Sequence, residues 1–318
     1  ERLFLGPVLD LRSVALLGGV GPGVFLVPSL FFGVLALAAA LRNRARRGAG
    51  FAPPLAVLVP AHNEQHQIAA TIAALDAAAA RYDGPVTVYI VDNASRDDTP
   101  QVARRALSQS RWLGGCVLSC TTPGKAKALN YGLAAIREDY VLRLDADTRL
   151  APDAIAMAAR HFADPQVGAV GGLPFPFHRR TFITRARQVE ILIKHGLYQM
   201  ALGTIDGTIG VPGMAVMYRC DTLVALGGFT EGMNGEDTDV AVRIGESGYR
   251  TVGDPSIVYI SEVPLSYRHL REQRMRWFRS IYHVSARNMD YLDGWRFSVR
   301  GKIVLPFMLV NSARRAMM

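Results

Sequence analysis

Cysteine is scarce in this sequence and has no pairing pattern. Its 318 residues include three cysteines, Cys116, Cys120 and Cys220. Their number is odd, and no two of them have C-x-x-C spacing. This usage indicates a reducing compartment without a disulfide framework. We expect all three cysteines to be inert residues of the core.

Two common nucleotide-binding patterns are also absent. Without G-x-x-x-x-G-K-[ST], a P-loop hydrolase would lack its phosphate cradle, and the lack of G-x-G-x-x-G argues against a nicotinamide or flavin enzyme. Acidic residues are outnumbered, with 27 Asp and Glu against 36 Lys and Arg. No nucleic-acid-binding motif accompanies this charge, and basic residues that flank apolar segments favour anionic lipid. We therefore expect a membrane, not a nucleic acid, as partner.

The longest run without charge lies near the start of the chain. Ser13 to Leu41 is 29 residues without a charged side chain, whereas about 20 apolar residues cross a bilayer. A cleaved signal peptide is the alternative, but its apolar region would be shorter and follow net positive charge. Four arginines come next, without an acid among them: Arg42, Arg44, Arg46 and Arg47. By the positive-inside rule we expect residues 1–47 to be a plasma-membrane segment whose basic flank, and the domain after it, are cytoplasmic.

From residue 48 the pattern changes to that of an α/β domain. Strands are predicted at Leu55–Val59, Val86–Val91, Val117–Ser119 and Tyr140–Leu144, and helices from Asn63 or Glu64 to Ala80, at Thr99–Ser108 and at Ala126–Ile136. This alternation predicts an open parallel sheet, in which ligands bind beyond the carboxyl ends of the strands. Pro60, Asp92 and Asp145 fall at those ends.

A pair of aspartates follows the last of these strands. If the extended path continues past Leu144, the carboxylates of Asp145 and Asp147 point to one face. Two such groups can hold magnesium or manganese, with phosphate and water filling the other positions. An isolated D-x-D is also common in surface turns, but the buried strand before this one favours the metal site.

Six short motifs occur in a consistent order between Leu55 and Trp277. They are Pro60-Ala61-His62-Asn63-Glu64, Val91-Asp92-Asn93-Ala94-Ser95, Lys125-Ala126-Lys127-Ala128-Leu129-Asn130, Asp145-Ala146-Asp147, Glu236-Asp237 and Gln273-x-x-Arg276-Trp277. Together they resemble the membrane-embedded family 2 glycosyltransferases, which include cellulose, chitin, hyaluronan and poly-N-acetylglucosamine synthases and ceramide-type lipid glucosyltransferases. The resemblance implies a GT-A type, Rossmann-like nucleotide-binding α/β domain with flanking transmembrane and interfacial helices. It also implies a nucleoside-diphosphate sugar donor, most often UDP-linked, and a divalent metal, manganese or magnesium.

Carried onto this chain, the family pattern assigns the donor site. Donor-binding residues would be Pro60, Asn63, Glu64, Asp92, Lys125, Asp145, Gln273 and Arg276. Asp92 would contact the uracil, although Asn93 stands where a second aspartate is commoner. Lys125 would pair with the diphosphate as a point charge, whereas outside the pattern it reads equally well as a solvated lysine. Asp147, with Asp145, would hold the metal.

The same resemblance places the general base at Asp237. This carboxylate would take the proton of an acceptor hydroxyl as the hydroxyl attacks the anomeric carbon and inverts it. Glu236 would contact the acceptor, and the segment Gly210–Met214 resembles the part of the family that lines the acceptor pocket. Glu236 and Asp239 compete for the role of base, and three acids so close together could also be surface charge.

Gln273, Arg276 and Trp277 have the spacing of one helix face. Arg276 would bind the diphosphate and Trp277 would stack on an acceptor sugar. An interfacial amphipathic helix at 271–282 explains the same residues equally well, and both interpretations are compatible. We therefore divide the chain into a cytosolic GT-A domain at 48–262, interfacial helices at 263–300, and the start of a C-terminal membrane segment at 301–318.

These expectations combine into one predicted function. The chain would be an inverting hexosyltransferase that moves a sugar from a UDP-sugar to a polysaccharide at the cytoplasmic membrane face, together with accessory membrane subunits. A lipid acceptor is the first alternative, and a non-catalytic nucleotide-sugar-binding subunit is the second. Retention of every acidic motif favours an enzyme. The sequence does not identify the sugar.

Overall fold

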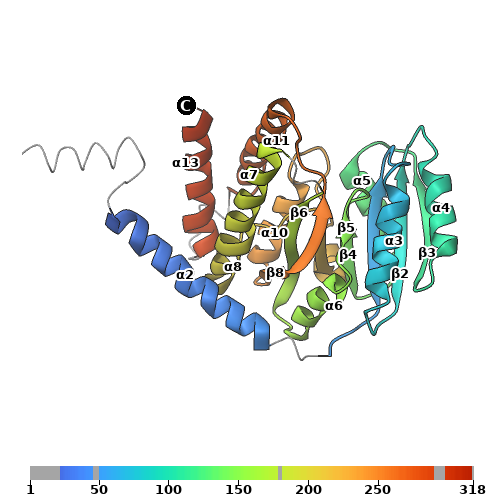
Figure 1. The fold of residues 1–318 in the computed structure, drawn as a ribbon, viewed down its shortest axis with the longest axis horizontal. Helices are drawn as coiled ribbons and strands as arrows, with labels where there is room; N and C mark the ends of the chain where they lie inside the picture. The colour runs from blue at the N-terminus through green and yellow to red at the C-terminus, as the bar shows by residue number, and fades with distance from the viewer. Residues whose placement is uncertain (1–21, 46–49, 178–180, 290–297, 317–318) are drawn as a thin grey trace, which may run out of the picture.

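The computed structural model describes residues 22–45, 50–177, 181–289 and 298–316 (Figure 1). Helix α2 (Pro22–Ala45) lies outside the sheet and packs along the short helix α8 (Gln199–Leu202). Its Phe32 ring is 4.9 Å from that of Tyr198, the residue before α8. The predicted membrane span from Ser13 begins outside the described ranges. Within them, every helix is too short or too polar to cross a bilayer.

One mixed sheet forms the centre of the domain. Its strands are β1 (Leu55–Ala61), β2 (Val86–Asn93), β3 (Leu113–Cys120), β4 (Tyr140–Leu144), β5 (Arg149–Leu150), β6 (Val167–Pro176), β7 (Ala215–Arg219) and β8 (Arg250–Ser261), in the order β3-β2-β1-β4-β7-β6-β8-β5. The predicted parallel sheet is correct for β3, β2, β1 and β4. Beyond β4 the expectation was wrong, because β7 runs antiparallel to β4 and β6, and β5 runs antiparallel to β8.

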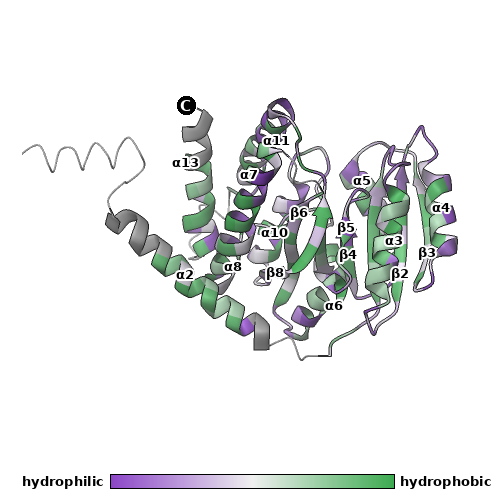
Figure 2. Cartoon of the chain, viewed as in Figure 1, coloured by the Kyte–Doolittle hydropathy of each residue, from purple (hydrophilic) through white to green (hydrophobic). Residues whose placement is uncertain are grey.

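Strand β1 is apolar throughout because both of its faces are covered. Leu55, Val57 and Val59 pack into a core with α3 (Ile68–Ala79), α4 (Thr99–Gln109) and α6 (Ala154–Ala159). Ala56 and Leu58 face the opposite core, which contains α5 (Lys125–Leu133). Alternate residues of a strand point to opposite faces, so a strand buried on both sides reads as a continuous apolar run. In Figure 2, β2 and α3 are correspondingly hydrophobic, and α4 carries hydrophilic residues outward.

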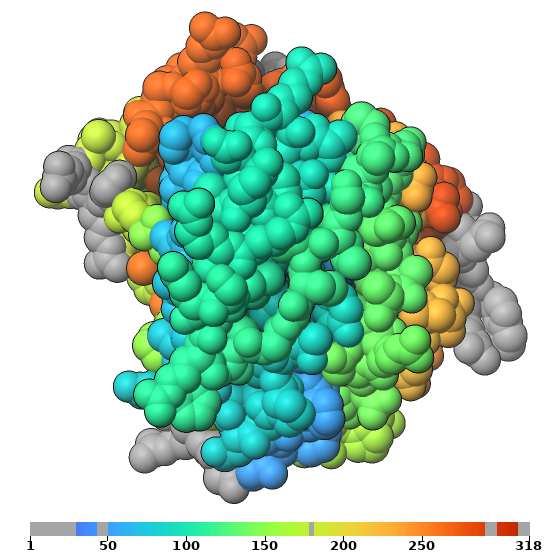
Figure 3. Space-filling view, turned by 90° about the vertical axis from the view of Figure 1, so that its right-hand side faces the viewer, coloured from blue at the N-terminus to red at the C-terminus, as the bar shows by residue number. Residues whose placement is uncertain are grey.

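Two sequence expectations in this half are corrected. Helix α3 begins at Ile68, not at Asn63 or Glu64, because Asn63 has φ of 55° and the following residues form turns. Cys116 is exposed on β3, an edge strand, whereas Cys120 and Cys220 are buried as expected. Figure 3 views the molecule from this side, where residues of the first half of the domain form most of the surface.

The helices of the second half lie mainly toward the β6 and β8 end of the sheet, away from α3 and α4 (Figure 1). Besides α8 they are η2 (Arg160–Ala163), α7 (Phe182–Ile191), η3 (Leu192–Tyr198), η4 (Gly203–Ile205), α9 (Cys220–Ala225), α10 (Glu236–Glu246), α11 (Tyr267–Arg287), η5 (Arg300–Val304) and α13 (Leu305–Ala316). Arg300 is fully buried, and its Nη2 lies 2.5 Å from Asp206 Oδ1. A Cβ at Gly245 would lie 1.2 Å from Arg300 Nη1, so only glycine leaves room for this arginine beside the last turn of α10.

Candidate active site

A pocket of about 380 Å³ opens at the carboxyl ends of β1, β2 and β4. Five residues predicted for the donor or metal site line it: Pro60, Glu64, Lys125, Asp145 and Asp147. His62 and Asn93 line it too, although neither had been assigned to the site. The pocket lies where an α/β sheet is expected to bind its ligand.

Asp145 and Asp147 are brought together by a turn. The amide of Thr148 donates to the carbonyl of Asp145 at 3.0 Å, so the chain turns directly after β4 and the predicted extended path was wrong. Burial raises the pKa of Asp147, and the nearby charge of Asp145 raises it further. The two carboxylates therefore repel each other across a short separation, which a cation between them would relieve.

The two carboxylates fit part of a magnesium or manganese site. Among the residues at 22–45, 50–177, 181–289 and 298–316, no three His, Cys, Asp or Glu side chains form a complete metal site. Magnesium-type ions commonly take one or two protein carboxylates, with substrate phosphates and water as the other ligands. Lys125 Nζ lies 2.7 Å from Asp145 Oδ1, so positive charge already meets this carboxylate. The donor set thus suits a cation that binds together with a diphosphate.

Glu64 holds its proton unusually strongly for a carboxyl group. Burial raises its pKa to about 7, and the charges of Asp147 and Glu262 add to the effect. Near neutral pH its side chain is therefore protonated in a large fraction of molecules. A protonated carboxyl in this pocket can donate a hydrogen bond to an oxygen of the donor as well as accept one.

Asn93 fixes the loop that carries Lys125. Its Oδ1 accepts from the amide of Gly124 at 2.8 Å, and its Nδ2 donates to the carbonyl of Thr122 at 2.8 Å. An aspartate could not make the second bond, because an ionised carboxylate only accepts. The departure from the commoner aspartate therefore has a structural reason, which the sequence alone did not reveal.

Four predicted donor residues do not line the pocket: Asn63, Asp92, Gln273 and Arg276. Asn63 joins two loops: its amide donates to Ser95 Oγ at 3.0 Å, and its Oδ1 accepts from the amide of Arg96 at 2.8 Å. Asp92 is buried at the end of β2, where its Oδ1 lies 3.4 Å from the amide of Ser95. Contact of Asp92 with uracil stays a prediction.

Arg143, which the motifs did not indicate, links the donor pocket to the predicted base. It is 2% exposed on β4, and its Nη2 lies 2.8 Å from Glu236 Oε1 and 3.9 Å from Asp145 Oδ1. Its charge also acts on Asp237. The only hint in the sequence was an arginine within the apolar strand Tyr140–Leu144. A buried cation among these acids holds the two sides of the site together electrostatically.

Asp237 occupies the first turn of α10, beside the predicted acceptor segment. Burial raises the pKa of Asp237, and the positive charge of Arg143 opposes this rise. A Cβ at Gly213 would lie 2.2 Å from Asp237 Oδ2, so the segment Gly210–Met214 passes directly against the carboxylate. The raised pKa suits a general base. Because Gly213 has no side chain, the predicted acceptor segment can pass directly beside this carboxylate.

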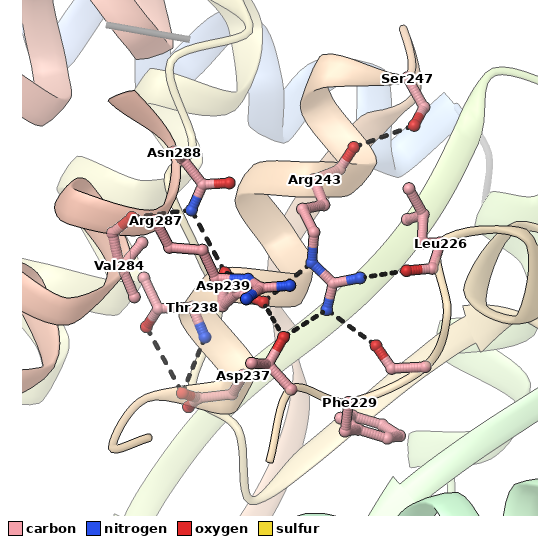
Figure 4. A network of polar contacts seen from close by, with 12 residues as sticks. Leu226, Phe229, Asp237, Thr238, Asp239, Arg243, Ser247, Val284, Arg287 and Asn288 are labelled. Carbon is pink, nitrogen blue, oxygen red and sulfur yellow. Dashed lines mark hydrogen bonds and ion pairs between the residues drawn. The ribbon is translucent and has the colours of Figure 1, made fainter. Parts of the chain in front are cut away.

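Asp239 has a structural role, which argues against it as the general base. It is fully buried, and its Oδ2 accepts from Thr230 Oγ1 at 2.7 Å and from Arg243 Nε at 2.8 Å. Asn288 Nδ2 donates to its Oδ1 at 3.2 Å. Figure 4 shows this network, which joins α10 to the end of α11. Asp239 therefore fixes the helix that carries Asp237. Its buried carboxylate is not accessible to an acceptor hydroxyl.

Asn130, five residues after Lys125 on α5, connects this helix to the acceptor side. Its Nδ2 donates to the carbonyl of Phe229, and its Oδ1 accepts from the amide of Phe229, both at 2.8 Å. The Phe229 ring in turn lies 5.5 Å from the guanidinium of Arg143. This pair of hydrogen bonds fixes the ring that supports Arg143.

The residues of the last motif do not all face one site. Arg276 is exposed, and Gln273 is half-buried with its Oε1 lacking a hydrogen-bond donor among the described residues. Trp277 is half-buried, and the cations of Arg187, Lys194 and Arg274 lie 5.3, 4.8 and 5.0 Å from its ring. Cations therefore already cover the ring that was predicted to stack on a sugar, and the arginines beside it are Arg187 and Arg274.

The fold is of the GT-A type, with the pocket at the carboxyl ends of the parallel strands. Solved structures that share this fold include the following two. The mannosyltransferase PcManGT from Pyrobaculum calidifontis, in complex with GDP-Man and Mn²⁺, is 24% identical with a TM-score of 0.66, over 91% of this chain and 84% of that one. TarS 1–349 from S. aureus, in complex with UDP-GlcNAc, is 16% identical with a TM-score of 0.57, over 82% and 73% of the two chains.

The chain belongs to glycosyl transferase family 2, whose model matches residues 56–222. Residues 140–314 match the related glycosyl transferase family group 2. An N-acetylglucosaminyltransferase from Bradyrhizobium diazoefficiens is 29% identical over 83% of this chain and 57% of its own length. A poly-beta-1,6-N-acetyl-D-glucosamine synthase from Staphylococcus aureus is 26% identical over 73% of this chain and 55% of its own. The chain thus spans less than two thirds of these relatives, and family membership confirms the expected hexosyltransferase class for the domain.

Proposed function

We propose that this protein is an inverting glycosyltransferase that moves N-acetylglucosamine from its UDP-linked donor to a glycan acceptor at a membrane. The sugar is proposed because the curated relatives are named for N-acetylglucosamine transfer and a structure of the same fold holds UDP-GlcNAc. The observation that carries the proposal is a set of neighbouring charged groups. Asp145 and Asp147 line the pocket, buried Arg143 lies 3.9 Å from Asp145, and the charge of Arg143 acts on Asp237.

The residues divide the chemistry between them. Asp145 and Asp147 would hold manganese or magnesium, which as a Lewis acid supports the charge of the departing diphosphate. When the donor binds, Lys125 leaves its ion pair with Asp145 and neutralises the charge of the phosphates. Asp237 takes the proton of the acceptor hydroxyl while that oxygen bonds to the anomeric carbon. The bond from this carbon to the diphosphate breaks, its electron pair leaves with UDP, and attack from the opposite side inverts the centre.

A membrane location is supported by apolar side chains on the outer helices. Large hydrophobic residues are exposed on α2 (Leu30, Phe31, Val34, Leu37 and Leu41), on α7 and η3 (Phe182, Val189, Leu192, Ile193 and Leu197), and on η5 and α13 (Ile303, Phe307 and Val310). Exposed apolar patches of this extent mark surfaces that meet a partner or a bilayer. In the proposal this side rests on the plasma membrane and the pocket faces the cytoplasm, where nucleotide sugars are made.

Transfer is tested with membranes that contain the full-length protein and a panel of radiolabelled nucleotide sugars. Label from UDP-GlcNAc should enter the product, whereas label from GDP-mannose and UDP-glucose should not. Separation into polymer and organic-extractable fractions distinguishes a glycan from a lipid acceptor. Absence of transfer from every donor, with the protein folded, would remove the proposal.

The orientation is tested by cysteine labelling of intact cells. In a protein with Cys116, Cys120 and Cys220 replaced by serine, a single cysteine at Asp164 should react with an impermeant reagent only after the membrane is opened. Labelling of that position from outside would reverse the proposed orientation and with it the source of the donor.

A further inference from the structure

Three cations surround the ring of Trp277, on the acceptor side of the site. Arg187 comes from α7, Lys194 from η3 and Arg274 from α11, all within 5.3 Å of the ring centre. Glu190 pairs with Arg187 and with Arg274. In the described part of the chain Lys194 has no ion pair. The cluster therefore carries more positive charge than its own carboxylate neutralises.

Two of these cations have unused donors. Arg187 is 6% exposed, and its Nε is buried without a hydrogen-bond partner among the described residues. Such a group costs free energy unless an acceptor reaches it. Lys194 is exposed as a whole residue, and its Nζ lies 4.8 Å from the centre of the Trp277 ring. Burial of that end, and the charge of Arg274, lower the pKa of Lys194 to about 8, so it stays mainly charged at neutral pH.

The cluster borders the acceptor, not the donor. The charges of Lys194 and Asp237 interact. Gln199, just after η3, donates through its Nε2 to the carbonyl of Gly210 at 3.1 Å, at the start of the segment that passes the base. The donor pocket has a cation of its own in Lys125, and no residue of the cluster lines that pocket.

Apolar side chains continue from the cluster along the same helical stretch. Val189, Leu192 and Ile193 are 56, 42 and 47% exposed, and they lie between Arg187 and Lys194 in the sequence. Positive charge beside exposed hydrocarbon matches an amphiphile whose anionic group is attached to a chain. Arginine forks and a lysine ammonium together are the donors that bind phosphate best.

We propose that Arg187, Lys194 and Arg274 bind a phosphate group of the acceptor, which makes the acceptor a glycan carried on a phosphate-bearing lipid. This inference rests on the proposed glycosyltransferase function and specifies its acceptor. The phosphate is held and takes no part in bond making. The nucleophile remains a hydroxyl elsewhere on the acceptor, whose proton passes to Asp237.

The test is equilibrium binding of radiolabelled decyl phosphate to the full-length protein in neutral detergent. Decyl phosphate should bind, decyl glucoside should not displace it, and UDP-GlcNAc should still bind its own pocket. Lys194→Met and Arg274→Gln should each weaken decyl phosphate binding about tenfold, the size expected for one charge-assisted hydrogen bond. Arg271→Gln removes an exposed charge from the same helix and should leave binding unchanged.

Competition by inorganic phosphate separates the sources of the anion. Weak competition, much poorer than that of unlabelled decyl phosphate, is expected for a site that recognises phosphate and chain together; equal competition would mean a site for free phosphate and would overturn the lipid assignment. Unchanged decyl phosphate binding in the Lys194 and Arg274 variants would show that this cluster is not the phosphate site. If these variants weakened UDP-GlcNAc binding as strongly, the cluster would belong to the donor. A folded wild type that binds UDP-GlcNAc but not decyl phosphate refutes this inference alone, whereas failure of the folded wild type to bind any nucleotide sugar refutes the proposed function.

Discussion

The donor side and the acceptor side of the site are built in different ways. On the donor side, loops at the ends of parallel strands are held by side-chain to backbone hydrogen bonds, such as those of Asn93 to Thr122 and Gly124. On the acceptor side, buried charges meet one another. Asp239, for example, is fully buried two residues from the predicted base, and its Oδ2 lies 2.8 Å from Arg243 Nε.

This difference indicates which side tolerates change. A loop fixed by several neutral hydrogen bonds loses about 0.5–1.5 kcal/mol when one bond is removed. A buried charge that loses its partner costs about 3–5 kcal/mol. We therefore expect ligand binding to fail first on the donor side and folding to fail first on the acceptor side.

Metal removal should have the largest effect, and it acts on the donor side alone. Excess EDTA should abolish transfer, because Asp145 and Asp147 would then repel each other and the diphosphate, and added manganese or magnesium should restore it. Thermal unfolding followed in parallel should change little. Full transfer in the presence of EDTA would contradict the assigned metal site.

Asp237→Asn should separate the two sides functionally. The amide keeps the shape of the side chain but cannot take a proton, so transfer should fall by about 10²-fold or more. UDP binding, measured by calorimetry, should survive, since the donor pocket is not lined by this residue. Glu246→Gln, at the other end of α10, serves as the matched control. If UDP binding disappeared while transfer persisted, Asp237 would not be the base.

Asp254→Asn tests the cost of a buried charge, because Asp254 lies 2.8 Å from both Arg160 Nη2 and His161 Nε2 and all three residues are buried. Loss of the partner of Arg160 should lower the free energy of unfolding by about 3 kcal/mol at neutral pH. Asp153→Asn breaks the exposed pair with Arg81, 3.0 Å apart, and should cost less than about 1 kcal/mol. Equal losses in the two variants, measured by urea unfolding, would contradict the larger cost assigned to a buried charge.

The same residue predicts a loss of stability in acid. Burial alone would raise the pKa of Asp254, but hydrogen bonds from His161 and Ser256 outweigh it and lower that pKa. Below about pH 4 the unfolded chain therefore binds more protons, and the free energy of unfolding falls as the pH falls. Asp254→Asn should flatten this decline, which denaturant titrations at several pH values would measure.

Asn130→Ala should have the smallest effect and tests the bridge between the sides. Loss of its two hydrogen bonds to Phe229 should lower the free energy of unfolding by about 1–3 kcal/mol. Transfer should fall more than donor binding, because Phe229 supports Arg143. Tyr131→Phe changes an exposed neighbour and should alter neither. A selective loss of donor binding would place Asn130 on the donor side only.

The same contrast explains what the sequence predicted. Strands β1 and β4 are recognisable as short apolar runs because both of their faces are buried. The acidic residues that follow these strands indicated where the pocket lies. Strand β6 escaped notice because it contains glycines and prolines, which are uncommon in strands. Its glycines are needed for close packing, since a Cβ at Gly171 would lie 2.4 Å from Val211 Cβ and one at Gly172 would lie 2.1 Å from the carbonyl oxygen of Ile257.

Residues whose role depends on distant partners were the hardest to predict. Arg143 acts through Glu236, and Trp277 acts through cations from α7 and η3, so no local spacing indicated either environment. The choice of Asp237 over Asp239 came from family resemblance, and the burial of Asp239 now supplies a physical reason for it. Motif spacing shows which residue types are present, whereas their contacts depend on the folded chain.

Arg300 has a practical consequence for shortened versions of the protein. Its guanidinium fills the space that Gly245 leaves at the end of α10, where a cation also favours the carbonyl end of the helix dipole. A version that stops before residue 300 would leave the space beside Gly245 unfilled and Asp206 without this partner. The safe place to divide the protein is therefore beyond this arginine, although every recognised motif ends more than twenty residues earlier.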